Sequence, residues 1–324
     1  MGRFEFAFDE VLPTIRSYEE VVADPLPPLA VLLDGLLLEK GRLVIGGDPG
    51  VGKSILVSQL CYCLASGSRF LNMGSIEPMR VMYAQAELPA QMVETRLRAQ
   101  DREFARLMRP GYLYHYTADP WDWDYQLPLL VNACLERHIE VLALDPLSAM
   151  LPPELDENSN KDINYFCRQV LAGLQAHCNL RALLIVHHFN KPNEFNVRSA
   201  PLARLSGAYS LARWTDAFIA MIASRQDNEA TLIFDKVRAF PPKPSLLVVR
   251  HDDTLTYTAE TGYDDLLWKA MDTGRHYTRD EMQAILNEEG LPAKKANMVI
   301  NKMRIDGLVT TNGKQYVRRE DAGQ

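Results

Sequence analysis

The chain has 324 residues, 47% of them hydrophobic, with a formal net charge of −7 and a pI near 5.6. This length and apolar fraction provide a sizeable core, for one large domain or for a large and a small one. The acidic balance excludes a general attraction to nucleic acid, so any contact with DNA has to come from local patches.

The cysteines and the apolar runs indicate the cellular compartment of the protein. Five cysteines lie in apolar helix-like or strand-end segments without the paired spacing of a zinc site: Cys61, Cys63, Cys134, Cys167 and Cys178. We therefore expect reduced, buried thiols in a cytoplasmic protein. The apolar stretch over 31–38 is too short to cross a bilayer and contains Asp34. Neither a signal peptide nor a membrane span is expected.

In chain order, a Pro-rich N-terminal arm comes first and an α/β region follows. Residues 1–38 predict an arm, a kind of segment that often packs on a neighbouring subunit. Over 39–260, apolar runs alternate with helical patterns, which predicts a mostly parallel sheet with helices on both faces. The strands expected in it are 42–46, 80–84, 141–144, 182–186 and 217–222. Antiparallel strands at the sheet edge are expected at 230–238, 246–250 and 254–258.

The pattern changes at residue 261, where helices become dominant. Helices are expected at 264–271, 278–287 and 293–305, and a hairpin with an Asn-Gly turn at 307–317. Three helices followed by a hairpin resemble a winged-helix domain, which would occupy 261–318. The polar tail 319–324 is expected to fray.

A glycine-rich loop carries the clearest chemistry. It follows an apolar strand and precedes a helix, and it predicts a phosphate-binding P-loop for ATP through Gly47, Asp48, Pro49, Gly50, Val51, Gly52, Lys53, Ser54 and Ile55. Lys53 is expected to reach the β- and γ-phosphates, and the Ser54 hydroxyl to bind Mg²⁺. The alternative, a simple Gly/Pro turn, does not explain why strand and helix both lie where the motif requires them.

Two carboxylates extend this site. The apolar run over 141–144 ends in Asp145, as in a Walker B strand, and predicts that Asp145 lies beside Mg²⁺; a helix-capping role is the alternative. The run over 80–84 leads to Glu87, whose carboxylate could polarise the water that attacks the γ-phosphate.

The order P-loop, glutamate, aspartate resembles the RecA-like ATPases, and more closely the RepA-like and DnaB-like hexameric helicases. The resemblance implies that Glu87 is the catalytic base and that His187 or His188 ends a sensor strand. It also implies that Lys236 and Arg238 form a Lys-x-Arg pair that reaches the γ-phosphate held by the next subunit. A charged pair that protects an edge strand is the alternative for Lys236 and Arg238.

The implied function is a homo-oligomeric, hexameric ATP-driven DNA helicase or translocase of plasmid or phage type, with single-stranded DNA in a central channel and replication proteins as further partners. The alternative is an ATPase switch, a regulator or loader that does not unwind DNA. A small-molecule kinase lacks support, because no acceptor-binding lid is evident and the Lys236/Arg238 pair would have no role.

Nucleic acid could be held in two places. Basic residues in the loop over 190–207 suit a strand in the channel: Lys191, Arg198 and Arg204. Others on or near the last helix suit a duplex: Lys294, Lys295, Lys302 and Arg304. A solvated surface loop and a protein-binding winged helix remain the alternatives, and the loop over 152–161 is too acidic to hold phosphates.

Overall fold

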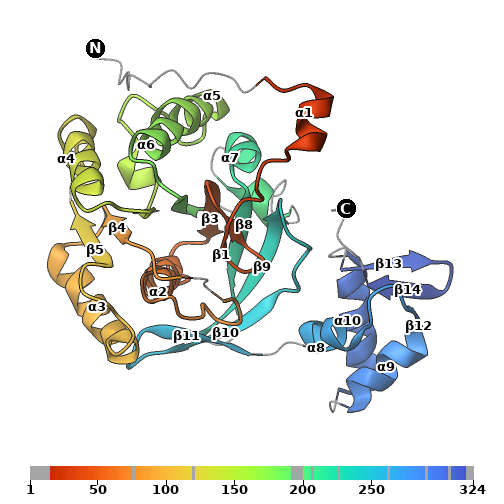
Figure 1. The fold of residues 1–324 in the computed structure, drawn as a ribbon. Coiled ribbons are helices and arrows are strands. Elements are labelled where there is room, and N and C mark those ends of the chain that lie inside the picture. The colour runs from red at the N-terminus through yellow and green to blue at the C-terminus, as the bar shows by residue number, and fades with distance from the viewer. Residues whose placement is uncertain are drawn as a thin grey trace.

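A computed structural model describes residues 15–74, 77–118, 121–190, 200–205, 208–224, 227–260, 263–288, 291–305 and 308–318. Its largest element is a nine-stranded sheet in the order β11-β10-β9-β8-β3-β7-β6-β4-β5. The strands from β8 to β5 run parallel, and β9, β10 and β11 continue the sheet antiparallel. The predicted mostly parallel sheet with an antiparallel edge is confirmed (Figure 1).

The sheet strands match the apolar runs closely. The parallel strands are β3 (Gly41–Gly47), β4 (Val81–Gln85), β5 (Leu113–Thr117), β6 (Val141–Asp145), β7 (Ala182–His188) and β8 (Ala217–Ala223). The antiparallel strands are β9 (Glu229–Val237), β10 (Leu246–His251) and β11 (Thr256–Glu260). β5 lacks a counterpart among the predicted strands, because its half-buried residues at the sheet edge lack the fully apolar character of the central strands.

Helices cover both faces of the sheet. On one face lie α2 (Lys53–Ser66) and α3 (Ala90–Phe104), packed on a core that includes Leu43, Ile45 and Val186. The other face packs against α4 (Trp123–Glu136), α5 (Asn160–Tyr165), the π-helical segment η2 (Phe166–Leu171), α6 (Ala172–His177) and α7 (Ala208–Trp214). Two short 3₁₀ turns, η1 (Ser148–Met150) and η3 (Pro201–Arg204), lie in the connections. Successive residues of a strand therefore point to different helix layers.

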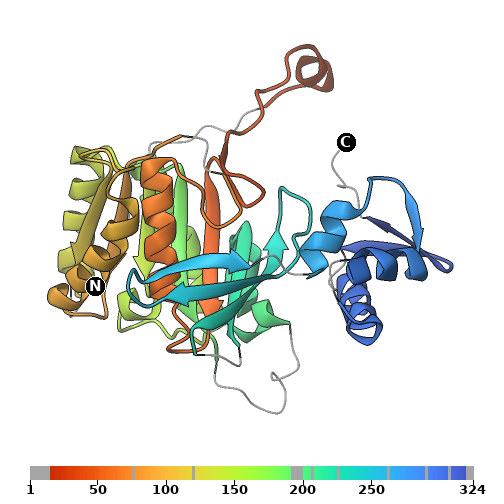
Figure 2. The same cartoon turned by 90° about the horizontal axis from the view of Figure 1, so that it is seen from below.

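The N-terminal segment divides into two parts. α1 (Tyr18–Ala23) contains no buried residue and projects from the body of the protein (Figure 2). β1 (Val31–Leu33) and β2 (Leu37–Leu38) form a hairpin whose leucines lie in the main core. The expected arm over 1–38 therefore includes a segment that belongs to the core, because Leu32, Leu33, Leu36 and Leu37 are buried there.

The C-terminal segment has a hydrophobic core of its own. It contains α8 (Tyr263–Ala270), α9 (Arg279–Glu288) and α10 (Ala293–Ile305), with an antiparallel sheet of β12 (His276–Thr278), β14 (Gln315–Arg318) and β13 (Val309–Asn312). The three helices and the final hairpin lie where the sequence predicted them, and β12 is an additional strand. None of the helices in the described ranges is long and apolar enough to cross a membrane.

Candidate nucleotide site

The P-loop connects the end of β3 to the start of α2. Gly50 and Gly52 take positive φ angles of 78° and 103°, which glycine adopts at low cost. No side chain caps the first turn of α2. The first backbone N–H groups of a helix have no partner within the helix, and they favour an anion there. The loop therefore presents the donors that a chain of phosphates requires.

Lys53, the first residue of α2, folds back over the loop. Its Nζ donates to the carbonyl oxygens of Gly47 at 2.9 Å and Asp48 at 2.8 Å. Burial lowers the pKa of Lys53 to about 8, and the negative charges of Asp145, Asp48 and Glu87 oppose this shift. A phosphate placed at this loop would favour the charged lysine further.

Asp145 ends β6, buried beneath the P-loop. The hydroxyl of Tyr83, on neighbouring β4, donates to Asp145 Oδ2 at 2.5 Å. Burial raises the pKa of Asp145, while hydrogen bonds from Tyr83 and Ser54 lower it. Within the described ranges, Asp145 Oδ1 is a buried acceptor without a hydrogen-bond partner. Mg²⁺ takes oxygen ligands, so the Ser54 hydroxyl and the Asp145 carboxylate fit this ion.

Glu87 lies just beyond the end of β4, on the exposed side of the same site. Gln85, which pairs in register with Asp145, holds this turn. Its side-chain oxygen accepts from the backbone N–H groups of Glu87 at 3.2 Å and Leu88 at 2.8 Å. The negative charge of Glu87 influences the pKa of Lys53, Asp145 and His188, which places its carboxylate at the same end of the sheet.

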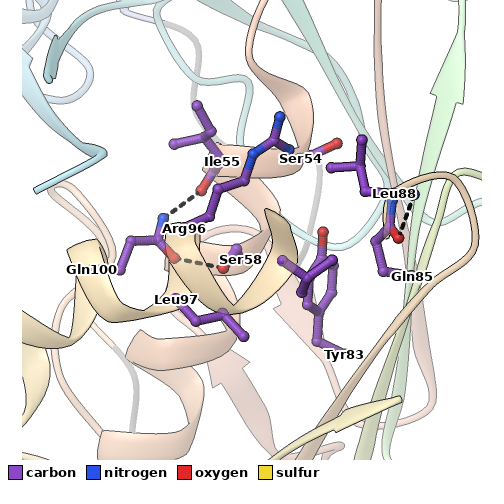
Figure 3. Close-up of a pocket in the computed structure, with 10 residues that line it drawn as sticks. Ser54, Ile55, Ser58, Tyr83, Gln85, Leu88, Arg96, Leu97 and Gln100 are labelled. Atoms are coloured by element: carbon purple, nitrogen blue, oxygen red, sulfur yellow. Dashed lines mark hydrogen bonds between the residues drawn. The ribbon is translucent and has the colours of Figure 1, made fainter. Parts of the chain in front are cut away.

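A small cavity of about 10 Å³ lies behind the P-loop, between α2, β4 and α3 (Figure 3). It is lined in part by Ser54, Tyr83 and Arg96. The Gln100 amide closes it, donating to Ile55 O at 3.0 Å and accepting from Ser58 Oγ at 2.5 Å. A space of this size accepts a water molecule at most. Tyr83, Gln85 and Arg96 were not predicted from the sequence, because only their contacts with distant residues distinguish them from ordinary strand and helix positions.

The two histidines at the end of β7 point to different faces of the sheet. His188 shares its face with Val186, on the side of α2, and pairs in register with Gly47. Burial lowers the pKa of His188, the positive charge of Lys53 lowers it further, and Glu87 opposes both. His187 is fully buried on the face that it shares with Ile185. Of the pair, His188 is therefore the one directed towards the P-loop.

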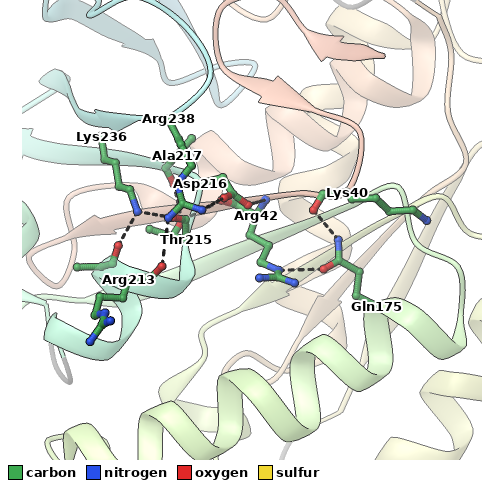
Figure 4. Close-up of polar contacts among 10 residues, drawn as sticks. Lys40, Arg42, Gln175, Arg213, Thr215, Asp216, Ala217, Lys236 and Arg238 are labelled. Carbon is green, nitrogen blue, oxygen red and sulfur yellow. Dashed lines mark hydrogen bonds and ion pairs between the residues drawn. The ribbon is translucent and has the colours of Figure 1, made fainter. Parts of the chain in front are cut away.

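Lys236 and Arg238 lie at the opposite end of the sheet from the P-loop. Figure 4 shows the two side chains near each other, with Arg238 directed to Asp216. Lys236 Nζ donates to the carbonyl oxygens of Ala212 at 2.6 Å and Thr215 at 2.5 Å. Arg238 Nη1 pairs with Asp216 Oδ1 at 2.8 Å, and its side chain is 56% exposed. The structure brings these two cations together and separates them from Lys53 of the same chain.

Of the residues predicted to bind nucleic acid, some are exposed and others are paired with carboxylates. Lys294 and Arg304 are exposed, whereas Lys302 Nζ pairs with the buried Asp264 at 2.9 Å. Arg204 Nη2 lies 3.0 Å from Asp48 Oδ1, so its charge is directed to the P-loop. Three predictions fall outside the described residues or side chains: Lys191, Arg198 and the side chain of Lys295.

The fold and the site together define a RecA-like P-loop ATPase. The AAA domain family model matches residues 12–194, more than half of the chain, and the chain belongs to this family. Among solved structures, a KaiC-like protein from the archaeon Pyrococcus horikoshii OT3 is similar in fold. It is 11% identical with a TM-score of 0.51, and the match covers 71% of this chain and 93% of that chain. No curated protein matches the sequence.

Proposed function

We propose that the chain is a homo-oligomeric, hexameric DNA translocase or helicase of plasmid or phage type that hydrolyses ATP. One observation carries this proposal: the P-loop group and the Lys236/Arg238 pair lie at opposite ends of one sheet. Within one chain, the Lys236/Arg238 pair therefore cannot contribute to the P-loop site. A neighbouring copy that places its pair against the phosphates would complete it, as in RecA-like rings.

In this proposal each residue of the P-loop end has one role. Lys53 binds the β- and γ-phosphates, and Ser54 and Asp145 hold Mg²⁺, which would neutralise phosphate charge when bound. Glu87 takes the proton of the attacking water. His188 contacts the γ-phosphate as the sensor. Its lowered pKa keeps the imidazole neutral near pH 7, so it can donate or accept a hydrogen bond there.

The projecting N-terminal segment supports assembly. Ile15, Tyr18, Val22 and Leu26 have exposed fractions of 88%, 78%, 62% and 72%. Apolar side chains clustered on a protruding segment favour burial against another protein surface. A second copy of this chain is the partner that the incomplete catalytic site requires.

The C-terminal segment would act as a winged helix. Its three helices precede the β13–β14 hairpin, and Lys294 and Arg304 of α10 are exposed. These side chains are available for phosphates of a duplex.

Two observations favour an ATPase switch that does not unwind DNA as the second candidate. Lys302 and Arg204 are held by Asp264 and Asp48, which removes two of the predicted DNA contacts. The segment after β6 also carries carboxylates, Glu154 and Asp156, that would repel a phosphate backbone.

The test is the ATPase rate with and without single-stranded DNA, measured together with the mass of the nucleotide-bound assembly. We expect a ring-sized species and stimulation of at least about tenfold, and loss of turnover in Lys53→Ala by about 100-fold or more. A monomer, or a ring whose rate DNA does not change, would favour the switch. Turnover retained in Lys53→Ala would remove the P-loop assignment itself.

A further inference from the structure

A polar groove lies between α5 with η2 on one side and α7 on the other, on the sheet face opposite α2. Its volume is about 450 Å³. The residues that line it are Asn160, Lys161, Asn164, Arg168, Ser210, Arg213 and Trp214. None of the roles proposed above uses this groove.

The lining is basic although the chain as a whole is acidic. Lys161, Arg168 and Arg213 are exposed, and no carboxylate is among the described residues that line the groove. Arg168 Nε donates to the neutral Asn164 Oδ1 at 3.0 Å. The carboxylate of Asp162, on the same helix, is directed to the preceding loop, where it accepts a hydrogen bond from the backbone N–H of Asp156 at 3.3 Å. The described lining of the groove therefore gathers three exposed cationic side chains on one face of an acidic protein.

The walls of the groove are fixed before any ligand arrives. Ser210 Oγ donates to Asn160 O at 2.6 Å, which joins α7 to α5. At the other end, the Arg42 guanidinium lies 4.7 Å from the centre of the Trp214 ring. Fixed walls reduce the ordering cost of binding.

The chemistry of the lining selects phosphate and not a base. Among the described lining residues, Trp214 is the one aromatic side chain, and it is only 7% exposed, so its ring is not available for stacking. The donors are instead two guanidinium groups, an ammonium group and amides, which suit phosphate oxygens. Because the cations are exposed, the site is open to a long polymer and does not enclose a small molecule.

The position of the groove also matches a nucleic-acid path. α5 follows the segment after β6, and α7 follows the segment after β7. The resemblance to RecA-like rings implies that both connections face the central channel. The first carries Glu154 and Asp156, so a polyanion is repelled there and attracted to the groove beside it.

We propose that this groove binds the phosphodiester backbone of single-stranded DNA, with Lys161, Arg168 and Arg213 contacting phosphates and without base specificity. The inference rests on the proposed function as a DNA translocase and adds where the strand is held. Binding is expected to depend steeply on salt, because each neutralised phosphate releases counterions.

The test is fluorescence anisotropy of a labelled oligo-dT strand, titrated at several salt concentrations with nucleotide present. We expect Arg168→Glu/Arg213→Glu to weaken binding at least about tenfold and to reduce the salt slope by about two. Arg168→Gln/Arg213→Gln adds no negative charge, and it should also weaken binding and reduce the salt slope. The matched control is Arg98→Glu/Arg106→Glu, the same charge change at exposed positions of α3 and its C-terminal end. Thermal melting verifies that each variant is folded.

The outcomes separate the two proposals. Wild-type protein that binds no DNA at low salt would count against the translocase itself. Wild-type binding that the groove variants and the control retain equally would overturn the groove and leave the translocase in place. Groove variants that lose affinity for inorganic pyrophosphate but not for oligo-dT would overturn the inference in favour of a small-anion site.

Discussion

Arg204, on the segment that returns from β7, pairs with Asp48 of the P-loop, with Arg204 Nη2 3.0 Å from Asp48 Oδ1. The guanidinium also lies 4.4 Å from the centre of the Phe189 ring, and the Arg204 side chain is only 14% exposed. Backbone bonds join the same segment to β7, from Asn190 N to Arg204 O at 2.7 Å. The pair neutralises a carboxylate at the place where the phosphates of a nucleotide would lie.

Removing Arg204 should weaken nucleotide binding. Arg204→Gln leaves the Asp48 charge unpaired near the phosphates, and we expect the Kd of a fluorescent ATP analogue to rise about 3- to 10-fold, in line with a partly buried pair. Asp48→Asn removes the repulsion and should restore the affinity when combined with Arg204→Gln. A double variant as weak as Arg204→Gln alone would contradict this electrostatic reason.

Gly52 is expected to tolerate a side chain poorly. Its φ is 103°, and an added Cβ would lie 2.0 Å from Tyr257 Oη. We expect Gly52→Ala to lower the free energy of unfolding by at least about 2 kcal/mol, through strain and overlap, and to abolish nucleotide binding.

Gly50→Ala is the matched control for that substitution. Gly50 has a φ of 78°, but no atom lies within 4 Å of an added Cβ, so only the backbone strain of about 1 kcal/mol remains. Tyr257→Phe should recover part of the stability of Gly52→Ala, because the next atom, Tyr257 Cζ, is 3.3 Å away. Denaturant unfolding measures the free energy of unfolding of each variant. Equal losses of stability in Gly50→Ala and Gly52→Ala would show that overlap with Tyr257 is unimportant.

Much of the fold followed from local patterns. The P-loop is contiguous in sequence, and the central strands are continuous apolar runs, because both their faces are covered by helices. The end of β6 at Asp145 could be predicted for the same reason. The hairpin β1–β2 could not, since its leucines are buried only by distant parts of the core.

Long-range pairing explains most of what the sequence did not reveal. Arg204 and Lys302 look like free surface cations until the fold brings Asp48 and Asp264 to them. Tyr83 looks like any residue of a buried strand until its hydroxyl meets Asp145. Polar contacts of this kind depend on strand register and helix placement, which a single sequence does not specify at side-chain precision.

Tyr83→Phe should shift the pH dependence of turnover. The Tyr83 hydroxyl stabilises ionised Asp145, whose pKa burial already raises, so removal of the donor raises that pKa further. The protonated acid then persists to higher pH, and the acid limb of the pH–rate profile should move upward. Activity on that limb should fall by about 3- to 10-fold, with little change at higher pH.

Tyr62→Phe controls for loss of a buried hydroxyl, because Tyr62 Oη donates to Leu97 O at 3.1 Å and does not contact Asp145. The measurement is kcat/KM for ATP from pH 5.5 to 9 in both variants. A uniform loss at every pH in Tyr83→Phe would indicate a packing effect and not a shift in the pKa of Asp145.

Variants at the two ends of the sheet should complement each other. Arg238→Ala keeps an intact P-loop but loses the trans cation, and Lys53→Ala keeps the cation but loses the P-loop. Each alone should be inactive as a ring. In a 1:1 mixture, about a quarter of the sites combine an intact P-loop with an intact Arg238, so ATPase activity should return to about a quarter of the wild-type rate.

The experiment requires that the two variants exchange subunits. It must also distinguish the proposed role of Arg238 in the neighbouring site from the contribution of its ion pair with Asp216 to stability. Its pair with Asp216 is half exposed, so Arg238→Ala should cost at most about 1 kcal/mol of stability, which thermal melting checks. The control mixture joins Lys53→Ala to the double variant Lys53→Ala/Arg238→Ala, where no intact P-loop exists and no activity should return. If the first mixture also stays inactive although mass measurement shows exchanged rings, Arg238 does not act across the interface between copies.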